Sequence, residues 1–315
     1  MNSRIRYIIY ILPVPLFFIS LTMGKYPVNF AEIFEDCPSS LIVWYIRMPR
    51  ILLALIAGAS LSLSGAVLQG IFRNPLVSPS ILGLSAGASF GAAMAILFFG
   101  ISPHPLAFIF GILAVYLSYL IAKSPGKATR ISLIIGGIVV SALFSAMLYV
   151  LKYLADPNHL PTVIYWLMGS LNYTHWSSVI VIIPIFIICF TLVYITRWRL
   201  NVLSTGDEES KVLGVDPAKW RLIYITLSTL LAASVTAVCG IIGWIGLIVP
   251  HLVRMAFGPD HRYLIPLSAS AGGCILLCAD DLVRAILPYE LPVSVLTSLM
   301  GIPFFIYLLR RGYGW

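Results

Sequence analysis

Long apolar runs with few charged residues dominate this chain and constrain its fold more than any other feature. Of its 315 residues, 60% are hydrophobic and 10% are charged, whereas soluble domains carry about 25% charged residues. A chain this apolar cannot cover its surface with polar side chains in water, so lipid must be its solvent. Because no polar stretch is long enough for a separate soluble domain, residues 1–315 are expected to form a single membrane domain.

Runs long enough to cross a hydrocarbon core of about 30 Å recur along the sequence. Nine are clear, and they cover residues 5–23, 51–71, 80–99, 104–122, 131–151, 177–196, 221–239, 263–279 and 293–309. A tenth run, 241–257, contains Pro250, His251 and Arg254, so a short or broken span is expected there. The N-terminal run follows Arg4 and Arg6 without a clean cleavage site, which favours a first span over a signal peptide.

The placement of Lys and Arg residues distinguishes nine spans from ten. With ten spans, one side of the membrane holds 15 of the 20 Lys and Arg residues and the other side holds 5. With nine spans the pattern breaks after residue 240. The positive-inside rule therefore predicts ten transmembrane helices in the cytoplasmic (inner) membrane, with both termini cytoplasmic. The same placement accounts for the net charge of +8, so membrane lipid rather than nucleic acid is the expected partner.

Small residues cluster within several of these runs, as in GASLSLSG (58–65) and SASAGG (268–273). Such residues let helices approach closely in lipid, where no hydrophobic force drives helices together. Three pairs of residues are also separated by 175 positions, which indicates an inverted internal repeat of the kind found in transporters. The pairs are Gly65 and Gly240, Pro75 and Pro250, and Gly83 and Gly258.

Three arginines lie on the side that is otherwise poor in cations. Arg47 and Arg50 are three residues apart and would share a helix face. Arg284 lies in ADDLVR, where Asp280 and Asp281 would be able to pair with it. These arginines either reach for lipid headgroups or form a cationic patch for an acidic partner.

Two loops on the cation-rich side stand out. The segment 71–80, IFRNPLVSPS, contains two prolines and is expected to be a shaped turn. In the loop at about 204–218, three acidic residues would open a short helix, two apolar residues would form a patch on it, and a glycine would end it. The residues concerned are Gly206, Asp207, Glu208, Glu209, Val212, Leu213 and Gly214. This loop is either ordinary solvated chain or a helix that docks a soluble partner.

The sequence contains no motif for catalysis or for a cofactor. GxxxxGK[ST], HExxH and GxSxG are all missing. The five cysteines, Cys37, Cys189, Cys239, Cys274 and Cys278, have no further ligand that would complete a metal site. The chain is therefore not expected to be an enzyme. A secondary transporter remains an alternative, although proton-coupled transporters usually show more ionisable residues deep in their spans. A membrane-embedded enzyme would need clustered polar side chains at one membrane depth.

Three blocks of the sequence together resemble the FecCD/BtuC type of permease, which belongs to ATP-binding-cassette importers of iron chelates and cobalamin. The blocks are RMPRILLALIAGASLSLSGAVLQGIFRNPLVSPSILGLSAGASFGA (47–92), GWIGLIVPHLVRMAFGPDHRYLIPLSA (243–269) and ADDLVRAILPYELPVSVLTSLMGIPFFIYLLRR (279–311). Within them, NPL (74–76), PHLVR (250–254), DHR (260–262) and GIPFFIYLL (301–309) are specific as a set. The similarity covers nearly the whole chain in order.

This resemblance implies a BtuC-like, type II importer fold with ten helices per subunit and two inverted halves. It implies a homodimer or close heterodimer with the translocation path between the subunits. A separate ATPase dimer would supply energy from the cytoplasm, and a binding protein would deliver the ligand on the outer face. The expected cargo is a metal chelate, either a ferric siderophore or haem, with cobalamin and molybdate as alternatives.

The resemblance also carries site residues onto this chain. Arg47, Arg50 and Arg284 match positions that dock the binding protein, although ADDLVR stands where the family usually has ADTLAR. Residues 206–216 match the coupling helices that sit on the ATPase dimer. The inner end of the fifth helix would form the gate of the path. There Thr129 matches a gate position, and two glycines, Gly136 and Gly137, would let the helix flex.

Overall fold

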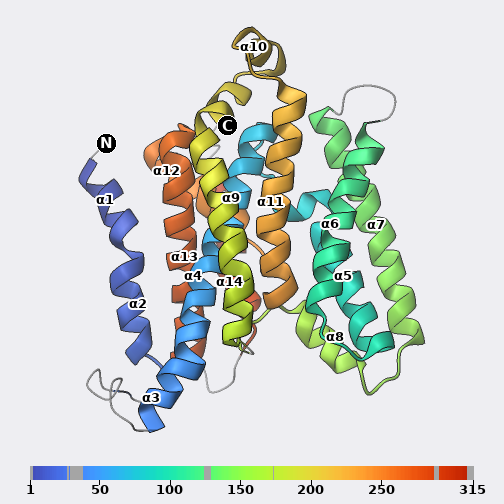
Figure 1. Cartoon of the computed structure of the whole chain (residues 1–315), viewed down its shortest axis with the longest axis vertical. Coiled ribbons are helices and arrows are strands. Elements are labelled where there is room, and N and C mark those ends of the chain that lie inside the picture. The colour runs from blue at the N-terminus through green and yellow to red at the C-terminus, as the bar shows by residue number, and fades with distance from the viewer. Residues whose placement is uncertain are drawn as a thin grey trace.

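The computed structural model describes residues 3–26, 28, 38–123, 129–172, 174–286 and 291–310, and every regular element in these ranges is a helix (Figure 1). The first half contains α1 (Ser3–Ile11), α2 (Pro13–Thr22), α3 (Pro38–Ile42), the π-helical turn η2 (Val43–Arg47), α4 (Met48–Phe72), the 3₁₀ turn η3 (Pro79–Leu82), α5 (Leu84–Met94), the π-helical turn η4 (Ala95–Phe99), α6 (His104–Ala122) and α7 (Arg130–Leu154). The second half contains α8 (Leu160–Leu167), α9 (Trp176–Leu203), α10 (Asp207–Val212), α11 (Pro217–Cys239), α12 (Ile245–Phe257), α13 (His261–Ile286) and α14 (Val293–Arg310). The predicted all-helical fold is confirmed.

Each of the ten predicted spans coincides with a helical segment. Six helices are long and apolar enough to cross a membrane, and α1 with α2, bent by 41° at the break between them, would make a further span. Three shorter apolar helices cover 84–99, 245–257 and 293–307. The irregular tenth run is therefore confirmed as a short helix, α12, with Pro250 inside it. The number of membrane crossings stays a prediction.

Helix α4 forms the centre of the bundle, and its small residues bring its neighbours into direct backbone contact. A Cβ atom added to Gly58 would lie 2.2 Å from the carbonyl oxygen of Gly272 on α13. One added to Gly65 would lie 1.7 Å from the carbonyl oxygen of Gly246 on α12. Both crossings thus depend on glycine, because any side chain would force the helices apart.

The two halves of the chain are interleaved. Helix α4 packs on α12 and α13, and helix α11 packs on α5 and α6. Each half thus places its first long helix against the second and third membrane helices of the other half. The three residue pairs at a spacing of 175 do not occupy equivalent places, however. Gly65 lies within α4, whereas Gly240 follows the end of α11, so the repeat is expressed in helix packing and not in those pairs.

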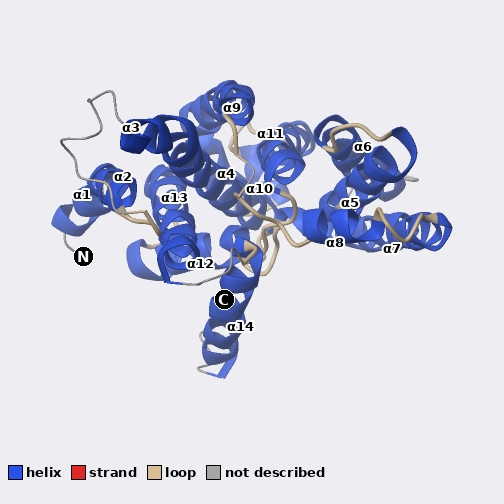
Figure 2. Ribbon diagram, turned by 90° about the horizontal axis from the view of Figure 1, so that it is seen from below, coloured by secondary structure: helices blue, strands red, loops and turns tan. Residues whose placement is uncertain are grey.

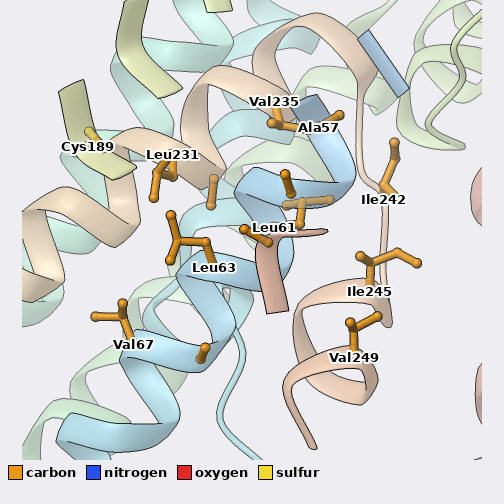
Figure 3. Packing of buried hydrophobic residues seen from close by; sticks show 14 of the residues in the cluster. Ala57, Leu61, Leu63, Val67, Cys189, Leu231, Val235, Ile242, Ile245 and Val249 are labelled. Carbon is orange, nitrogen blue, oxygen red and sulfur yellow. The ribbon is translucent and has the colours of Figure 1, made fainter. Parts of the chain in front are cut away.

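The buried core follows α4 along its length. Figure 3 shows Ala57, Leu61 and other α4 side chains between residues of α11 and residues of α12, such as Leu231 and Ile245. All of these side chains are buried. The core therefore joins helices that are far apart in the sequence.

The outside of the bundle is apolar, as expected for a protein that faces hydrocarbon. On α9, Ile180 and Ile195 are 64% and 65% exposed. Figure 2 shows α14 projecting away from the bundle, with α5, α6 and α7 grouped on the side opposite α1 and α2. Figure 1 shows α10 at one end of the bundle and α3 and α8 at the other, and α1 begins nearer the α10 end. These are called the α10 end and the α8 end below.

Several local features differ from the expectation or refine it. The second span begins earlier than predicted, because α3 and η2 continue into α4 as one helix from Pro38 to Phe72. The short helix α8 was not predicted. The expected turn at 71–80 is confirmed: Arg73 adopts a left-handed conformation with φ of 52°, and the Leu76 N–H donates to Asn74 Oδ1 at 2.9 Å.

Candidate functional site

Helix α10 is held in place by contacts along one side and its two ends. Ser210 is fully buried, and its hydroxyl donates to the carbonyl of Val202, at the end of α9, at 2.9 Å. The Val215 N–H donates to the Ser210 carbonyl at 2.9 Å. Gly206 precedes the helix, and Gly214 follows it with a φ of 77°. The predicted helix and its glycine end are confirmed, although the helix is short.

The free face of α10 presents two apolar side chains. Val212 is 88% exposed and Leu213 is 58% exposed, at the end of a helix that lies outside the bundle of membrane helices (Figure 1). The predicted apolar patch is therefore present at the end of α10. An apolar patch at the tip of a charged, anchored helix has the chemistry of a docking surface.

The acidic first turn of α10 connects it to two membrane helices. Asp207 Oδ1 accepts a hydrogen bond from Arg130, the first residue of α7, at 2.6 Å. Both Asp207 carboxylate oxygens accept from Arg221 on α11, at 2.8 and 2.7 Å. Burial alone would raise the pKa of Asp207, but the hydrogen bonds and charge of Arg221, followed by the charge of Arg130, outweigh it and lower that pKa. Asp207 is therefore ionised at neutral pH and links α10 to α7 and α11.

The other two acidic residues of this turn lie close to residues within or next to α10. Glu208 forms an ion pair with Lys211 one turn later, and its side chain is 82% exposed. Glu209 lies beside Gly206, where an added Cβ would collide with the carboxylate. Sequence reasoning found the acidic turn but missed its partners, because Arg130 and Arg221 are 77 and 14 residues away from Asp207.

The predicted gate lies next to this ion-pair network. Thr129 caps the N-terminus of α7: its hydroxyl oxygen accepts from the Ser132 N–H at 3.1 Å. The preceding loop, including Lys127 and Ala128, lies outside the described residues. A recess of about 1290 Å³ lies between this end of α7 and α10, and its lining includes Thr129, Arg130 and Asp207. The structure therefore brings the predicted gate residue and the predicted coupling helix together.

Gly136 and Gly137 on α7 pack closely against neighbouring elements. A Cβ on Gly136 would lie 2.7 Å from the Ser118 carbonyl oxygen on α6, and one on Gly137 would lie 2.1 Å from the Ile81 carbonyl oxygen. Helix α7 runs regularly from Arg130 to Leu154 through both positions. Close packing is one reason for glycine at both positions, and their role in flexure of α7 stays a prediction.

At the α8 end, Arg50 is buried and paired within the chain. Its side chain is buried and faces the fully buried carboxylate of Asp280 on α13. Arg50 Nε lies 2.9 Å from Asp280 Oδ2, and Arg50 Nη2 lies 2.8 Å from Oδ1. The sequence suggested that Asp280 would pair with Arg284. The structure corrects this pairing, because Asp280 holds Arg50 instead.

Arg47 and Arg284 are also engaged within the chain. Arg47 is buried and donates to the carbonyl of Leu21 at 2.7 Å and to the carbonyl of Tyr26. Arg284 pairs with Asp281 and donates to the Ser20 carbonyl at 2.9 Å. The three arginines thus gather near the end of α2 and the end of α13. Their role in docking stays a prediction, but none of them is the freely exposed cation that the sequence suggested.

Asp281 contacts both α2 and Arg284. Its carboxylate accepts from the Ser20 hydroxyl as well as from Arg284. Sequence reasoning missed Ser20, since a serine within an apolar span carries no signal for a partner 261 residues away.

No metal centre is visible in the described ranges, where no three His, Cys, Asp or Glu residues gather. Of the cysteines, Cys189, Cys239 and Cys274 are buried and Cys278 is exposed, all as free thiols. Cys37 lies outside the described residues.

Comparison with known proteins identifies relatives of this chain and a solved structure with the same fold. The chain is 39% identical to a molybdate import system permease protein, MolB, of Haemophilus influenzae, over 93% of this chain and 92% of that protein. It is 37% identical to a hemin transport system permease protein, HmuU, of Yersinia pestis, over 93% of this chain and 91% of that protein. It superposes on a solved metal-chelate type ABC transporter in an inward-facing conformation with a TM-score of 0.90 and 38% identity, over 98% of this chain and 100% of that chain.

The relatives are permease subunits of importers with several cargoes, and a cobalamin import system permease protein, BtuC, of Halobacterium salinarum is 40% identical over 86% of this chain and 74% of that protein. The model of the FecCD transport family matches residues 11–311, which is nearly the whole chain. The chain therefore belongs to the FecCD transport family.

Proposed function

We propose that this chain is the membrane-spanning subunit of an ATP-binding-cassette importer and that its cargo is a metal chelate, either a ferric siderophore or haem. The observation that carries the proposal is the exposed, anchored tip of α10 in a chain of this family. The chain itself lacks an ATP-binding motif, so the energy must come from a separate ATPase, whose dimer would receive Val212 and Leu213.

The proposed coupling runs through Asp207. Movement of the ATPase would displace α10, and the hydrogen bonds of Asp207 to Arg130 and Arg221 would pass that displacement to the first turns of α7 and α11. Thr129 lies one residue before Arg130. A small shift of α10 would therefore move the proposed gate directly, without any bending at Gly136 or Gly137.

The proposed binding-protein site lies at the α8 end. Because Arg47, Arg50 and Arg284 already have partners within the chain, an acidic residue of the binding protein would have to compete with them. Arg284 is the best candidate for exchange. Its pair with Asp281 is a single contact between neighbouring turns, whereas Arg50 is held by two-point hydrogen bonds to a buried carboxylate. Docking would thus rearrange the end of α13.

The proposed assembly places two copies of this chain, or this chain and a close paralogue, side by side in the inner membrane with both termini in the cytoplasm. Helices α7 and α14 carry exposed apolar side chains, including Ile135 and Leu299 at 55% and 65% exposure. These faces would contact either lipid or the second subunit. Cysteine cross-linking of Leu299→Cys in membranes, compared with Ile180→Cys on α9, would show which face meets a second copy.

Molybdate is a second candidate cargo, because the MolB relative is 39% identical over nearly the whole chain. Uptake assays on complexes reconstituted with the ATPase and the binding protein would distinguish the two candidate cargoes. Uptake of ferric siderophore or haem, but not of radioactive molybdate, would support the first proposal. Uptake that persists without the ATPase would instead support a secondary transporter and would overturn the importer assignment.

A further inference from the structure

A pocket of about 490 Å³ lies at the α10 end of the bundle, where α4, α9 and α12 end and α13 begins. It adjoins the recess between α7 and α10, and Arg73 and Asn74 border both. Arg254, His251 and His261 also line it, and the described residues around it include no Asp or Glu. The pocket therefore has cationic side chains without any anionic counterpart.

Arg254 is the residue that most needs an explanation. It lies half-buried in the last turn of α12. Within the described part of the chain its guanidinium has neither an ion pair nor a hydrogen bond. It lines the pocket together with two histidines, His251 and His261. An unpaired charge that is partly removed from water is unfavourable unless a counter-charge is supplied.

The nearest carboxylate in the sequence does not supply that counter-charge. Asp260 Oδ2 accepts from Arg262 Nε at 2.9 Å, and Asp260 Oδ1 accepts from Asn201 Nδ2 at 2.7 Å. Asn201 in turn accepts from the backbone N–H of His261 at 2.8 Å. Asp260 is thus committed to the start of α13 and lies outside the lining of the pocket.

The dipole of α12 is the main alternative explanation, since a cation in the last turn of a helix is favoured. That effect weakens quickly beyond the terminal turn and is screened by salt. It is smaller than the cost of leaving a half-buried guanidinium without a counter-ion. It also does not explain why Arg73, at the end of α4, converges on the same pocket.

We propose that this pocket binds the phosphate group of an anionic ligand, with Arg254 as its main contact and Arg73 at its mouth. A phosphate offers several oxygen acceptors to the planar donor set of an arginine and can accept from two arginines at once. The phosphate comes either from an anionic lipid headgroup at the membrane surface or from free inorganic phosphate. The bound group would join the ends of α4 and α12. This site is independent of the proposed transport function.

The test uses the full-length chain, purified in a neutral detergent without its ATPase. Its melting temperature would be followed as inorganic phosphate replaces chloride at constant ionic strength. At ten times the dissociation constant, phosphate is expected to raise the melting temperature by about 3 °C. Arg254→Gln is expected to lose this rise. Arg262→Gln is the matched control, since Arg262 lies close by in sequence but is 63% exposed and already paired with Asp260.

A second arm identifies the source of the phosphate. Native mass spectrometry would compare lipid retained from bilayers of phosphatidylglycerol and phosphatidylcholine. Retention of phosphatidylglycerol that depends on Arg254 and falls on addition of inorganic phosphate would assign the site to a lipid headgroup. A response to inorganic phosphate without lipid retention would assign it to the free anion.

The proposal fails if native protein gains no stability from phosphate and retains no anionic lipid, or if Arg254→Gln responds as native protein does. If Arg254→Gln does not fold, Arg73→Gln serves instead, because Arg73 is exposed at the mouth of the pocket. It is expected to weaken phosphate affinity several-fold, and an unchanged affinity would overturn the site. A defect of Arg254→Gln confined to ATPase assembly, with phosphate response intact, would instead mean that the pocket receives a protein carboxylate.

Discussion

Asp207 on α10 and Arg130, the first residue of α7, are joined by a hydrogen bond of 2.6 Å. Replacing Asp207 with Asn keeps the shape of the side chain and removes its charge. Because the carboxylate is 42% exposed, solvent screening limits the loss to about 1 kcal/mol. We expect about a fivefold fall in uptake per ATP hydrolysed in the reconstituted complex.

The matched control for this change is Glu208→Gln, on the same turn of α10. Glu208 is 82% exposed and contacts Lys211 only, so its replacement is expected to leave coupling unchanged. Equal effects of the two substitutions would mean that the negative charge of α10, and not its link to α7, determines coupling.

The pH dependence of this link follows from the lowered pKa of Asp207. A carboxylate whose pKa falls on folding stabilises the protein above its unfolded value of about 3.9 and loses that contribution as the pH falls through the folded value. The contribution of Asp207 to coupling is therefore expected to stay constant between pH 5 and pH 8. Uptake measured across this range in native and Asp207→Asn complexes should differ by a constant factor. A difference that vanishes towards the acidic end would contradict the lowered pKa.

The apolar tip of α10 should be needed for assembly and not for folding. Leu213→Asp places a charge on a side chain that is 58% exposed, so the melting temperature of the isolated chain is expected to change little. Its binding to the ATPase is expected to weaken at least tenfold, since a charge would enter an apolar contact. Co-purification with the tagged ATPase measures this loss. Tyr153→Ser at the other end of α7, which alters a side chain that is 89% exposed, is the control.

Variants of the Arg50–Asp280 pair would distinguish a structural role of Arg50 from a docking role. Replacing either residue by Ala leaves a buried charge and is expected to cost about 3–5 kcal/mol of folding stability. The double variant removes both charges and should recover part of that loss. Thermal unfolding of the four proteins gives the coupling energy. If the double variant folds but no longer captures the binding protein, Arg50 also acts in docking; if capture is normal, its role is structural.

The contact between Gly65 and Gly246 predicts a strong effect of a single methyl group. Gly65→Ala would place a Cβ atom 1.7 Å from a carbonyl oxygen, so α4 and α12 must separate. We expect a loss of several degrees in melting temperature or no folded protein. Gly243→Ala, where an added Cβ meets nothing within 4 Å, is expected to fold normally. Similar stability of the two variants would show that this crossing relaxes easily.

Much of the fold could be predicted because span length and loop charge are local properties. The ten apolar runs and the glycine that ends α10 were all visible in short windows of sequence. Helix α8 was missed because it is only 8 residues long and lies beside longer apolar runs. The extension of α4 back to Pro38 was missed because the charges of Arg47 and Arg50 interrupt the apolar run, whereas the fold buries both side chains.

The candidate site was predicted as separate pieces, and their connections were not. The acidic turn, the gate and the outer arginines each have a sequence pattern. Their partners do not, because Asp280 lies 230 residues from Arg50 and Arg130 lies 77 residues from Asp207. Sequence spacing cannot show which charges meet once helices from both halves are interleaved. The close packing of Gly136 and Gly137 was missed for the same reason, since their packing partners belong to other elements.

The crossing of Gly58 with Gly272 sets a condition on how the protein is made. Roughly 200 residues of chain separate the two glycines, so at about 5–20 residues per second the ribosome needs about 10–40 s to produce the second after the first. During that interval the glycine-rich face of α4 lacks its permanent neighbour. The first half of the chain must therefore wait in the membrane, shielded by lipid or by the insertion machinery, and a truncated chain that ends before α13 would remain there as a target for quality-control proteases.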